Sequence, residues 1–137
     1  MLRRNEKAEL LKRVPLFADC SRGELEEIAQ LADEIDLAEG KELTRLGESG
    51  REFFVLLEGT ANVTKNGRRI NTLGSGDFFG EIALVSDTPR TATVTATSPV
   101  RALVVTDRSF RRLLEDSPSI QSKVLTALAE RLAPEVV

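Results

Sequence analysis

The residues that could do chemistry gather in one stretch of the chain: Gly80, Glu81, Arg90 and Thr91. Gly80 permits a backbone conformation or a close approach that a side chain would block. Residues 81–84 are good material for a short helix, whose N-terminus offers free N–H groups to an anion. Arg90 and Thr91 come directly before a run of β-branched residues, so we expect one guanidinium and one hydroxyl to be held near this loop.

These groups suit a ligand that carries both a phosphate and a hydroxyl. A guanidinium donates two parallel hydrogen bonds to phosphate oxygens. The Glu81 carboxylate would repel a bare phosphate, but it can accept hydrogen bonds from a sugar hydroxyl. A 3′,5′-cyclic nucleotide combines a singly charged phosphate with a free ribose hydroxyl. A plain surface ion pair between Glu81 and Arg90, which contributes little, stays open on these residues alone.

The composition argues against an enzyme. The chain has no histidine, the commonest metal ligand and the commonest general base near neutral pH. Cys20 is the only cysteine, so no intramolecular disulfide can form, which fits a reducing compartment. An isomerase or dioxygenase on a β-barrel therefore ranks last, and we expect no catalytic residue, no metal and no cofactor.

Charge and hydropathy indicate a cytoplasmic protein without nucleic-acid or membrane affinity. The net charge of −3 gives no general attraction to phosphates. The longest apolar run, residues 53–57, is far shorter than the roughly 20 residues of a membrane helix. No apolar stretch follows the basic start of the chain, so we expect no signal peptide.

The periodicity of apolar residues divides the chain into helices, strands and helices. Helical spacing occurs over residues 6–14, from Ser21 onward, over 107–115 and over 118–133, where Pro134 is expected to end the last helix. Between them lie short strand patterns with glycine-rich turns, typical of an antiparallel barrel or jelly roll. The predicted strands include 53–57, 61–65, 68–73, 91–97 and 100–105. Asn66-Gly67 predicts a hairpin with a type I′ turn.

The stretch around Arg90 resembles the phosphate-binding cassette of the cyclic-nucleotide-binding domain family. The usual cassette reads Phe-Gly-Glu, Leu or Ile, Ala-Leu, a short spacer, then Pro-Arg-Thr or Pro-Arg-Ala-Ala-Thr-Val. Here the chain reads Phe79-Gly80-Glu81-Ile82-Ala83-Leu84, a four-residue spacer, and Pro89-Arg90-Thr91-Ala92-Thr93-Val94.

The resemblance covers nearly the whole chain and implies a mainly β fold with flanking helices. We expect one domain over 1–137. Its parts would be N-terminal helices over about 1–33, an eight-stranded antiparallel β-barrel or jelly roll over 34–106, and two closing helices over 107–133. The cassette would lie at 79–92.

The resemblance also implies roles for single residues. Glu81 would accept a hydrogen bond from the ribose 2′-hydroxyl, and Arg90 would pair with the cyclic phosphate. The remaining phosphate-side residues would be Gly80, Thr91 and the backbone N–H groups of Ile82 and Ala83. The purine would face Val63 and Ile70, with Asn71 beside them. The last helix would close over the base, with Arg131 and Leu132 as lid residues.

The function implied by the resemblance is a sensor module for a cyclic nucleotide. cAMP is preferred to cGMP because it is the commoner ligand of compact family members. Ligand binding would be transmitted through the C-terminal helices to a partner, such as a separate effector protein. A homodimer through the apolar stripe of the last helix stays open, and DNA binding is not expected because no helix-turn-helix pattern follows. The alternative is a protein-interaction scaffold that keeps the barrel and binds no nucleotide.

Overall fold

The computed structural model describes residues 2–84 and 88–136, without the side chains of 82, 83 and 131–136. The chain forms two compact units. Ala32–Arg108 is the β unit, and Met1–Leu31 together with Ser109–Val137 is the helical unit.

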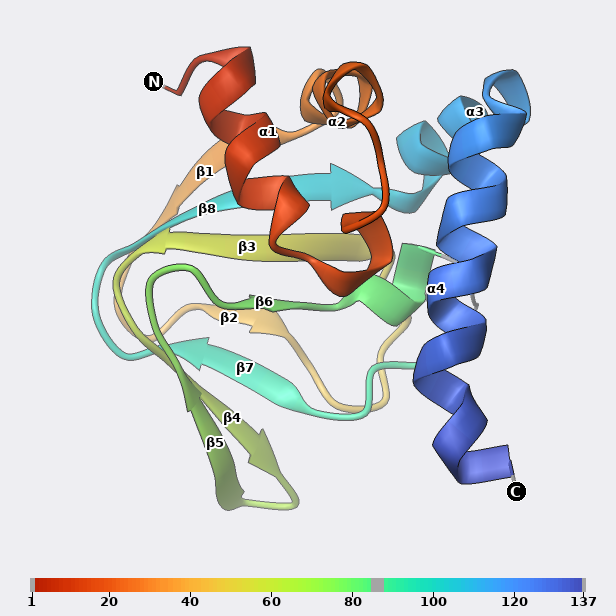
Figure 1. Cartoon of the computed structure of the whole chain (residues 1–137). Helices are drawn as coiled ribbons and strands as arrows, with labels where there is room; N and C mark the ends of the chain where they lie inside the picture. Colours follow the sequence, from red (N-terminus) through yellow and green to blue (C-terminus); the bar gives the residue numbers. More distant parts are fainter. Residues whose placement is uncertain (1, 85–87, 137) are drawn as a thin grey trace. The chain divides into compact units, whose positions relative to one another are not determined.

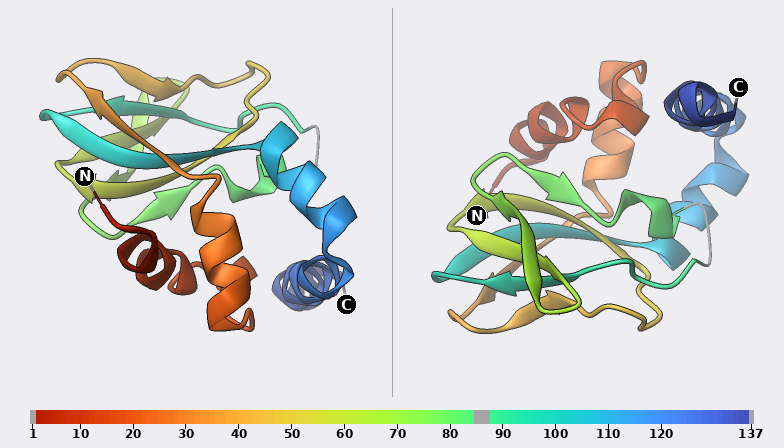
Figure 2. Two further views of the ribbon diagram at one scale, coloured as in Figure 1. Left: turned by 90° about the horizontal axis from the view of Figure 1, so that it is seen from above. Right: turned by 90° about the horizontal axis from the view of Figure 1, so that it is seen from below.

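Among the described residues, the β unit contains eight antiparallel strands in two sheets of four. Figures 1 and 2 show the arrangement of these strands. One sheet has the order β1-β8-β3-β6 and the other the order β2-β7-β4-β5. This arrangement confirms the predicted eight-stranded jelly roll. The strands are β1 Asp33–Leu37, β2 Glu42–Thr44, β3 Glu52–Glu58, β4 Ala61–Lys65, β5 Arg68–Leu73, β6 Phe78–Phe79, β7 Thr93–Ala96 and β8 Val100–Thr106.

The hairpin between β4 and β5 forms as its turn residues predict. Asn66 has φ of 53° and Gly67 has φ of 79°, the positive values that both central residues of a type I′ turn require. The strand predicted over 91–97 is shorter than expected. The Ala92 carbonyl accepts a hydrogen bond from the Thr44 hydroxyl at 3.1 Å, and β7 begins one residue later.

The core of the β unit comes from the inward faces of the two sheets. Leu56 and Ala102 supply one sheet's face, and Val94 and Ala96 the other's. Aromatic rings extend this core toward β6: the ring centroids of Phe54 and Phe79 lie 4.9 Å apart in a stacked arrangement. Since the faces bury aliphatic side chains, the strands are held by apolar area as well as by their ladders.

In its described residues the helical unit has five helical elements, and the first two residues of α3 belong to the β unit. Their bounds are α1 Arg4–Lys12, the 3₁₀ turn η1 Pro15–Phe17, α2 Arg22–Ala29, α3 Asp107–Asp116 and α4 Pro118–Val136. The helix predicted over 6–14 ends earlier because Val14 is extended (φ −78°, ψ 127°), as the proline after it favours.

The predicted end of the last helix at Pro134 is wrong. Helix α4 continues to Val136. Proline removes one backbone donor, but only two residues of α4 follow Pro134, so the loss falls in the last turn of the helix. No helix in the described part of the chain is long and apolar enough to cross a membrane.

The helical unit is held together between its N-terminal and C-terminal parts. The rings of Phe17 and Phe110 lie 5.6 Å apart, and α4 packs on η1. Ser21 caps α2 by accepting from the Glu24 N–H at 3.2 Å, while the Glu24 carboxylate accepts from the Ser21 N–H at 2.7 Å. The same carboxylate accepts from Lys123 of α4 at 2.5 Å. The Lys123 ammonium and the Ser21 N–H lower the pKa of Glu24 to about 2.

The ion pair predicts a pH-dependent stability. Glu24→Gln should lower the free energy of unfolding by about 1 kcal/mol at pH 6, because it removes the charge while retaining a capping acceptor. A depressed pKa stabilises the fold above the unfolded value and loses this contribution as the pH falls. The difference from wild type should therefore vanish between about pH 4.5 and about pH 2. Urea unfolding at several pH values measures it. Glu27→Gln, an exposed position of α2, is the control, and equal effects of both variants at every pH would contradict this account.

Candidate functional site

Arg90 is anchored by its main chain to the loop between β2 and β3. Its N–H donates to the Glu48 carbonyl at 3.0 Å, and its carbonyl accepts from the Gly47 N–H at 2.8 Å. The residues that follow are held as well, because the Leu46 N–H donates to the Thr93 hydroxyl at 2.9 Å. These hydrogen bonds therefore fix the backbone from which the Arg90 side chain extends.

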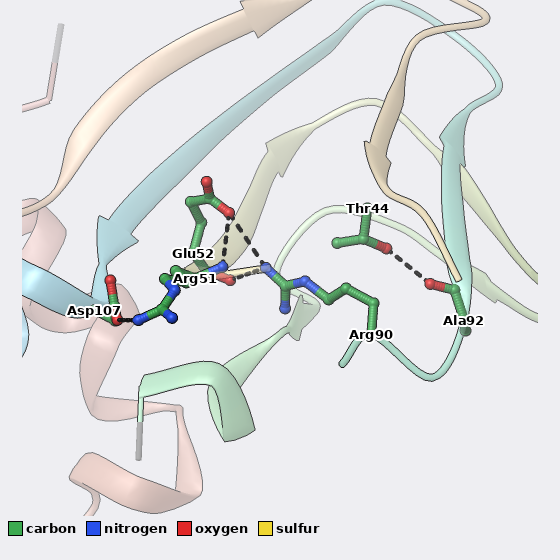
Figure 3. A network of polar contacts seen from close by, with 6 residues as sticks. All are labelled: Thr44, Arg51, Glu52, Arg90, Ala92 and Asp107. Carbon is green, nitrogen blue, oxygen red and sulfur yellow. Dashed lines mark hydrogen bonds and ion pairs between the residues drawn. The ribbon is translucent and has the colours of Figure 1, made fainter. Parts of the chain in front are cut away.

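The side chain of Arg90 points to the start of β3 (Figure 3). Its Nη2 donates to the Glu52 carbonyl at 2.5 Å and lies 3.4 Å from the Glu52 carboxylate. Only 9% of the side chain is exposed. Its Nε atom is buried and has no hydrogen-bond acceptor among the described residues.

Two glycines make room for this guanidinium. A Cβ atom on Gly50 would lie 1.7 Å from Arg90 Nε. A Cβ atom on Gly80, where φ is +81°, would lie 2.7 Å from Arg90 Nη1 and 2.7 Å from the Glu52 carbonyl oxygen. Gly80 thus has both reasons to be glycine, a positive φ and a close approach. Gly50 is required by the close approach alone.

Burial leaves Arg90 with an incompletely compensated charge. Loss of solvent lowers the pKa of its guanidinium, and the Glu52 carboxylate offsets only part of that effect. An arginine stays protonated in proteins, so its burial costs free energy unless its N–H groups find hydrogen-bond acceptors. An anion that reaches the buried guanidinium would meet this demand.

Among the cavities that Arg90 lines inside the β unit, two adjoin each other and measure about 340 Å³ each. This volume is within the range of small-molecule sites. The cassette cavity is lined by Gly80, Glu81, Thr88, Pro89, Arg90 and Thr91, and by Phe78 and Phe79. The hairpin cavity shares Phe78, Phe79, Gly80, Arg90 and Thr91, and adds Val63, Ile70, Asn71, Leu73, Thr44, Ala92 and Val94.

A β-bulge turns the hairpin residues toward this space. Val63 pairs with Asn71 and Thr64 pairs with Arg69, which leaves Ile70 as the extra residue. A bulge re-aims side chains, and here the consecutive Ile70 and Asn71 both line the hairpin cavity. Ile70 is 59% exposed, an unusual state for a large aliphatic side chain.

The structure brings most of the predicted site residues together around these cavities. Glu81, which is 8% exposed, lines the cassette cavity with Gly80, Arg90 and Thr91. Val63, Ile70 and Asn71 line the hairpin cavity. The short helix predicted after Gly80 is a single 3₁₀ turn, Glu81–Leu84. The side chains of Ile82 and Ala83, and those of the predicted lid residues Arg131 and Leu132, lie outside the described residues.

Sequence reasoning missed Gly50, Glu52 and Thr44. Glu52 and Gly50 lie 38 and 40 positions before Arg90, too far apart for a local pattern to connect them. A weak signal existed for Gly50, a second glycine close before a buried strand. Thr44, which orients Ala92, had none in its short strand.

A family model described as the cyclic nucleotide-binding domain matches residues 34–117. This chain belongs to that family. A cAMP-dependent protein kinase regulatory subunit of Mycosarcoma maydis is 42% identical over 118 residues, which cover 77% of this chain and 22% of the relative. The chain spans 17% to 29% of the length of five curated relatives.

Solved structures agree on the fold. The N-terminal domain of a transcriptional regulator from Streptomyces coelicolor superposes with a TM-score of 0.84 at 28% identity, covering 92% of each chain. The regulatory domain of Toxoplasma gondii PKA, crystallised with cAMP, has a TM-score of 0.74 at 28% identity and covers 93% of this chain and 50% of its own. The cyclic-nucleotide-binding fold therefore occurs both in kinase regulation and in a transcriptional regulator.

The packing of Arg90 predicts different costs for alanine at two glycines. Gly50→Ala should lower the free energy of unfolding by about 1–3 kcal/mol, because its Cβ displaces the guanidinium from Glu52. Gly23→Ala, where a Cβ meets no atom within 4 Å, should not lower it. Thermal and urea unfolding measure both, and an unaffected Gly50→Ala would contradict the described path of the Arg90 side chain.

Proposed function

We propose that this chain is a sensor module that binds a 3′,5′-cyclic nucleotide, with cAMP preferred to cGMP. The observation that carries the proposal is the buried, incompletely compensated guanidinium of Arg90, which lines both cavities. Family membership supports the ligand class. The names of the fungal regulatory subunit and of the Toxoplasma gondii structure support cAMP.

The lining of the two cavities suggests a pose. The cyclic phosphate would lie at Arg90, with the Thr91 hydroxyl and the backbone N–H groups of Ile82 and Ala83 as further donors. The ribose 2′-hydroxyl would donate to Glu81, whose carboxylate is buried beside Gly80 in the cassette cavity. The purine would occupy the hairpin cavity, whose lining combines aliphatic and aromatic side chains with polar ones. Such a site, apolar with a few directed polar groups, is typical of small-molecule binding.

Glu52 would compete with the ligand for Arg90. Its carboxylate, 3.4 Å from Nη2, occupies the acceptor position that a phosphate oxygen would take, whereas its carbonyl at 2.5 Å can remain bound. Glu52 is half-buried, so its carboxylate can turn to solvent when the phosphate arrives. Binding would then replace the Glu52 carboxylate by a phosphate oxygen, so the net free energy gained is smaller than that of the new contact alone.

The same segment connects the site to the start of α3. Arg51 precedes Glu52 and binds Asp107 twice: its carbonyl accepts from the Asp107 N–H at 2.7 Å, and its guanidinium lies 3.1 Å from the Asp107 carboxylate. A shift of residues 51–52 on phosphate binding would therefore move the first residue of α3. Transmission through the C-terminal helices to an effector protein would follow this path, and pairing of two copies through α4 remains part of the proposal.

Removing the guanidinium should abolish tight binding. Arg90→Ala should weaken cAMP or cGMP binding by roughly 30-fold to several thousand-fold, the effect of about 2–5 kcal/mol for a buried charge contact. Arg90→Lys should recover little, because an ammonium lacks the two-pronged geometry. Glu52→Gln should strengthen binding by up to about fivefold, since the competing charge is gone.

Calorimetric titration of the full chain measures these affinities. Arg101→Ala, which removes a partly exposed arginine paired with Asp36, is the matched control and should bind as wild type does. If wild type binds neither nucleotide, the proposal fails and the protein-interaction scaffold becomes the better account.

Transmission of ligand binding to the C-terminal helices predicts a change in their hydrogen exchange. Saturating cAMP should alter amide protection over residues 107–133, because α3 begins at the Asp107–Arg51 contact. Asp107→Asn should reduce that change while leaving binding within a few-fold. Protection that is identical with and without bound nucleotide would refute the path through residues 51 and 52.

A further inference from the structure

Asn71 stands out among the residues of the hairpin cavity. Of the described residues that line this cavity, it alone carries a side-chain amide. Its neighbours from the hairpin, Val63, Ile70 and Leu73, are aliphatic. Asn71 is exposed in the described structure, and a polar group among aliphatic ones can direct the orientation of a ligand that covers it.

The register places the Asn71 side chain on the inner face of its sheet. Asn71 pairs with Val63 across β4 and β5, and paired residues of an antiparallel ladder share a face. Val63 packs against the core cluster between the sheets. Asn71 therefore lies on the cavity side, although the strand as a whole is exposed.

The orientation of the amide is set by the main chain. The Thr72 N–H donates to Asn71 Oδ1 at 2.8 Å. Since a backbone N–H can only donate, the atom that accepts must be the oxygen. The oxygen keeps a second lone pair, and the Nδ2 group keeps its donors. Asn71 thus presents a donor and an acceptor side by side in a fixed orientation.

The other polar side chains of the hairpin cavity have a hydrogen-bond partner or a proposed role at the phosphate. The Thr44 hydroxyl donates to the Ala92 carbonyl at 3.1 Å. Arg90 and Thr91 belong to the phosphate end in the pose proposed above. Asn71 is thus the group left to contact the edge of the base.

We propose that Asn71 reads adenine by accepting from its 6-amino group and donating to its N7. Asparagine pairs with adenine in this bidentate way where proteins read DNA bases. A 6-oxo purine would place its carbonyl oxygen against Asn71 Oδ1 and lose one of the two bonds. The inference rests on the proposed function and assigns the selection of cAMP over cGMP to one side chain.

The test combines changes in the ligand with a change in the protein. The full chain is titrated with cAMP, with cyclic inosine monophosphate, which has a 6-oxo group and no 2-amino group, and with 7-deaza-cAMP. Wild type should bind cAMP about 5- to 140-fold more tightly than the inosine analogue, the ratio given by 1–3 kcal/mol of base discrimination. The 7-deaza analogue should also bind more weakly than cAMP.

Asn71→Leu should bring both ratios toward one, because neither base atom then has its partner. Thr72→Val, one position along β5 and absent from the cavity lining, is the matched control and should keep the wild-type ratios. If Asn71→Leu leaves both affinity ratios unchanged, or if wild type prefers the inosine analogue, the role of Asn71 is overturned while the proposed function stands. Failure of wild type to bind any of the nucleotides would overturn the proposed function and this inference together.

Discussion

A guanidinium with 9% of its side chain exposed costs free energy unless its donors find acceptors, and Arg90 depends on Glu52 for them. The main-chain carbonyl of Glu52 is an acceptor that no ligand needs to displace. Its carboxylate offsets part of the cost of burying the guanidinium charge. The guanidinium is therefore held in a desolvated position, where its attraction to an anion is stronger than it would be at the surface.

The surrounding structure follows from the need to bring this cation into a narrow space. Gly50 and Gly80 flank the guanidinium from two different loops, and neither position has room for a Cβ. The backbone bonds to Gly47 and Glu48 hold the start of the side chain. Beyond the guanidinium, the bulge at Ile70 brings aliphatic groups to the neighbouring cavity. One region thus combines a charged end and an apolar end, as an amphipathic ligand requires.

In the proposed function, the ligand site and the route out of the barrel would share one segment. Residues 51 and 52 are adjacent in β3 and its preceding loop, yet one contacts Asp107 and the other contacts Arg90. Because the two residues are consecutive, a displacement of one backbone is passed readily to the other. The helical unit has its own internal ties, the Phe17–Phe110 ring contact and the Glu24–Lys123 ion pair. The ring contact joins η1 to α3, and the ion pair joins α2 to α4.

Local patterns in the sequence determined the features whose partners lie a few residues away. The Asn66-Gly67 turn depends on two φ angles, and the Ser21–Glu24 cap on one helical turn, so both were predictable from residue type. The order of elements and the cassette residues were predictable as well. Tertiary structure alone decided that Glu52 and Gly50 meet Arg90, and that Ile70 bulges beside Asn71. Those contacts depend on strand register and on the path of the loops, and the Arg90–Glu52 contact joins residues 38 positions apart. The register is selected by the free energy of the whole sandwich, so no short window of sequence contains the information.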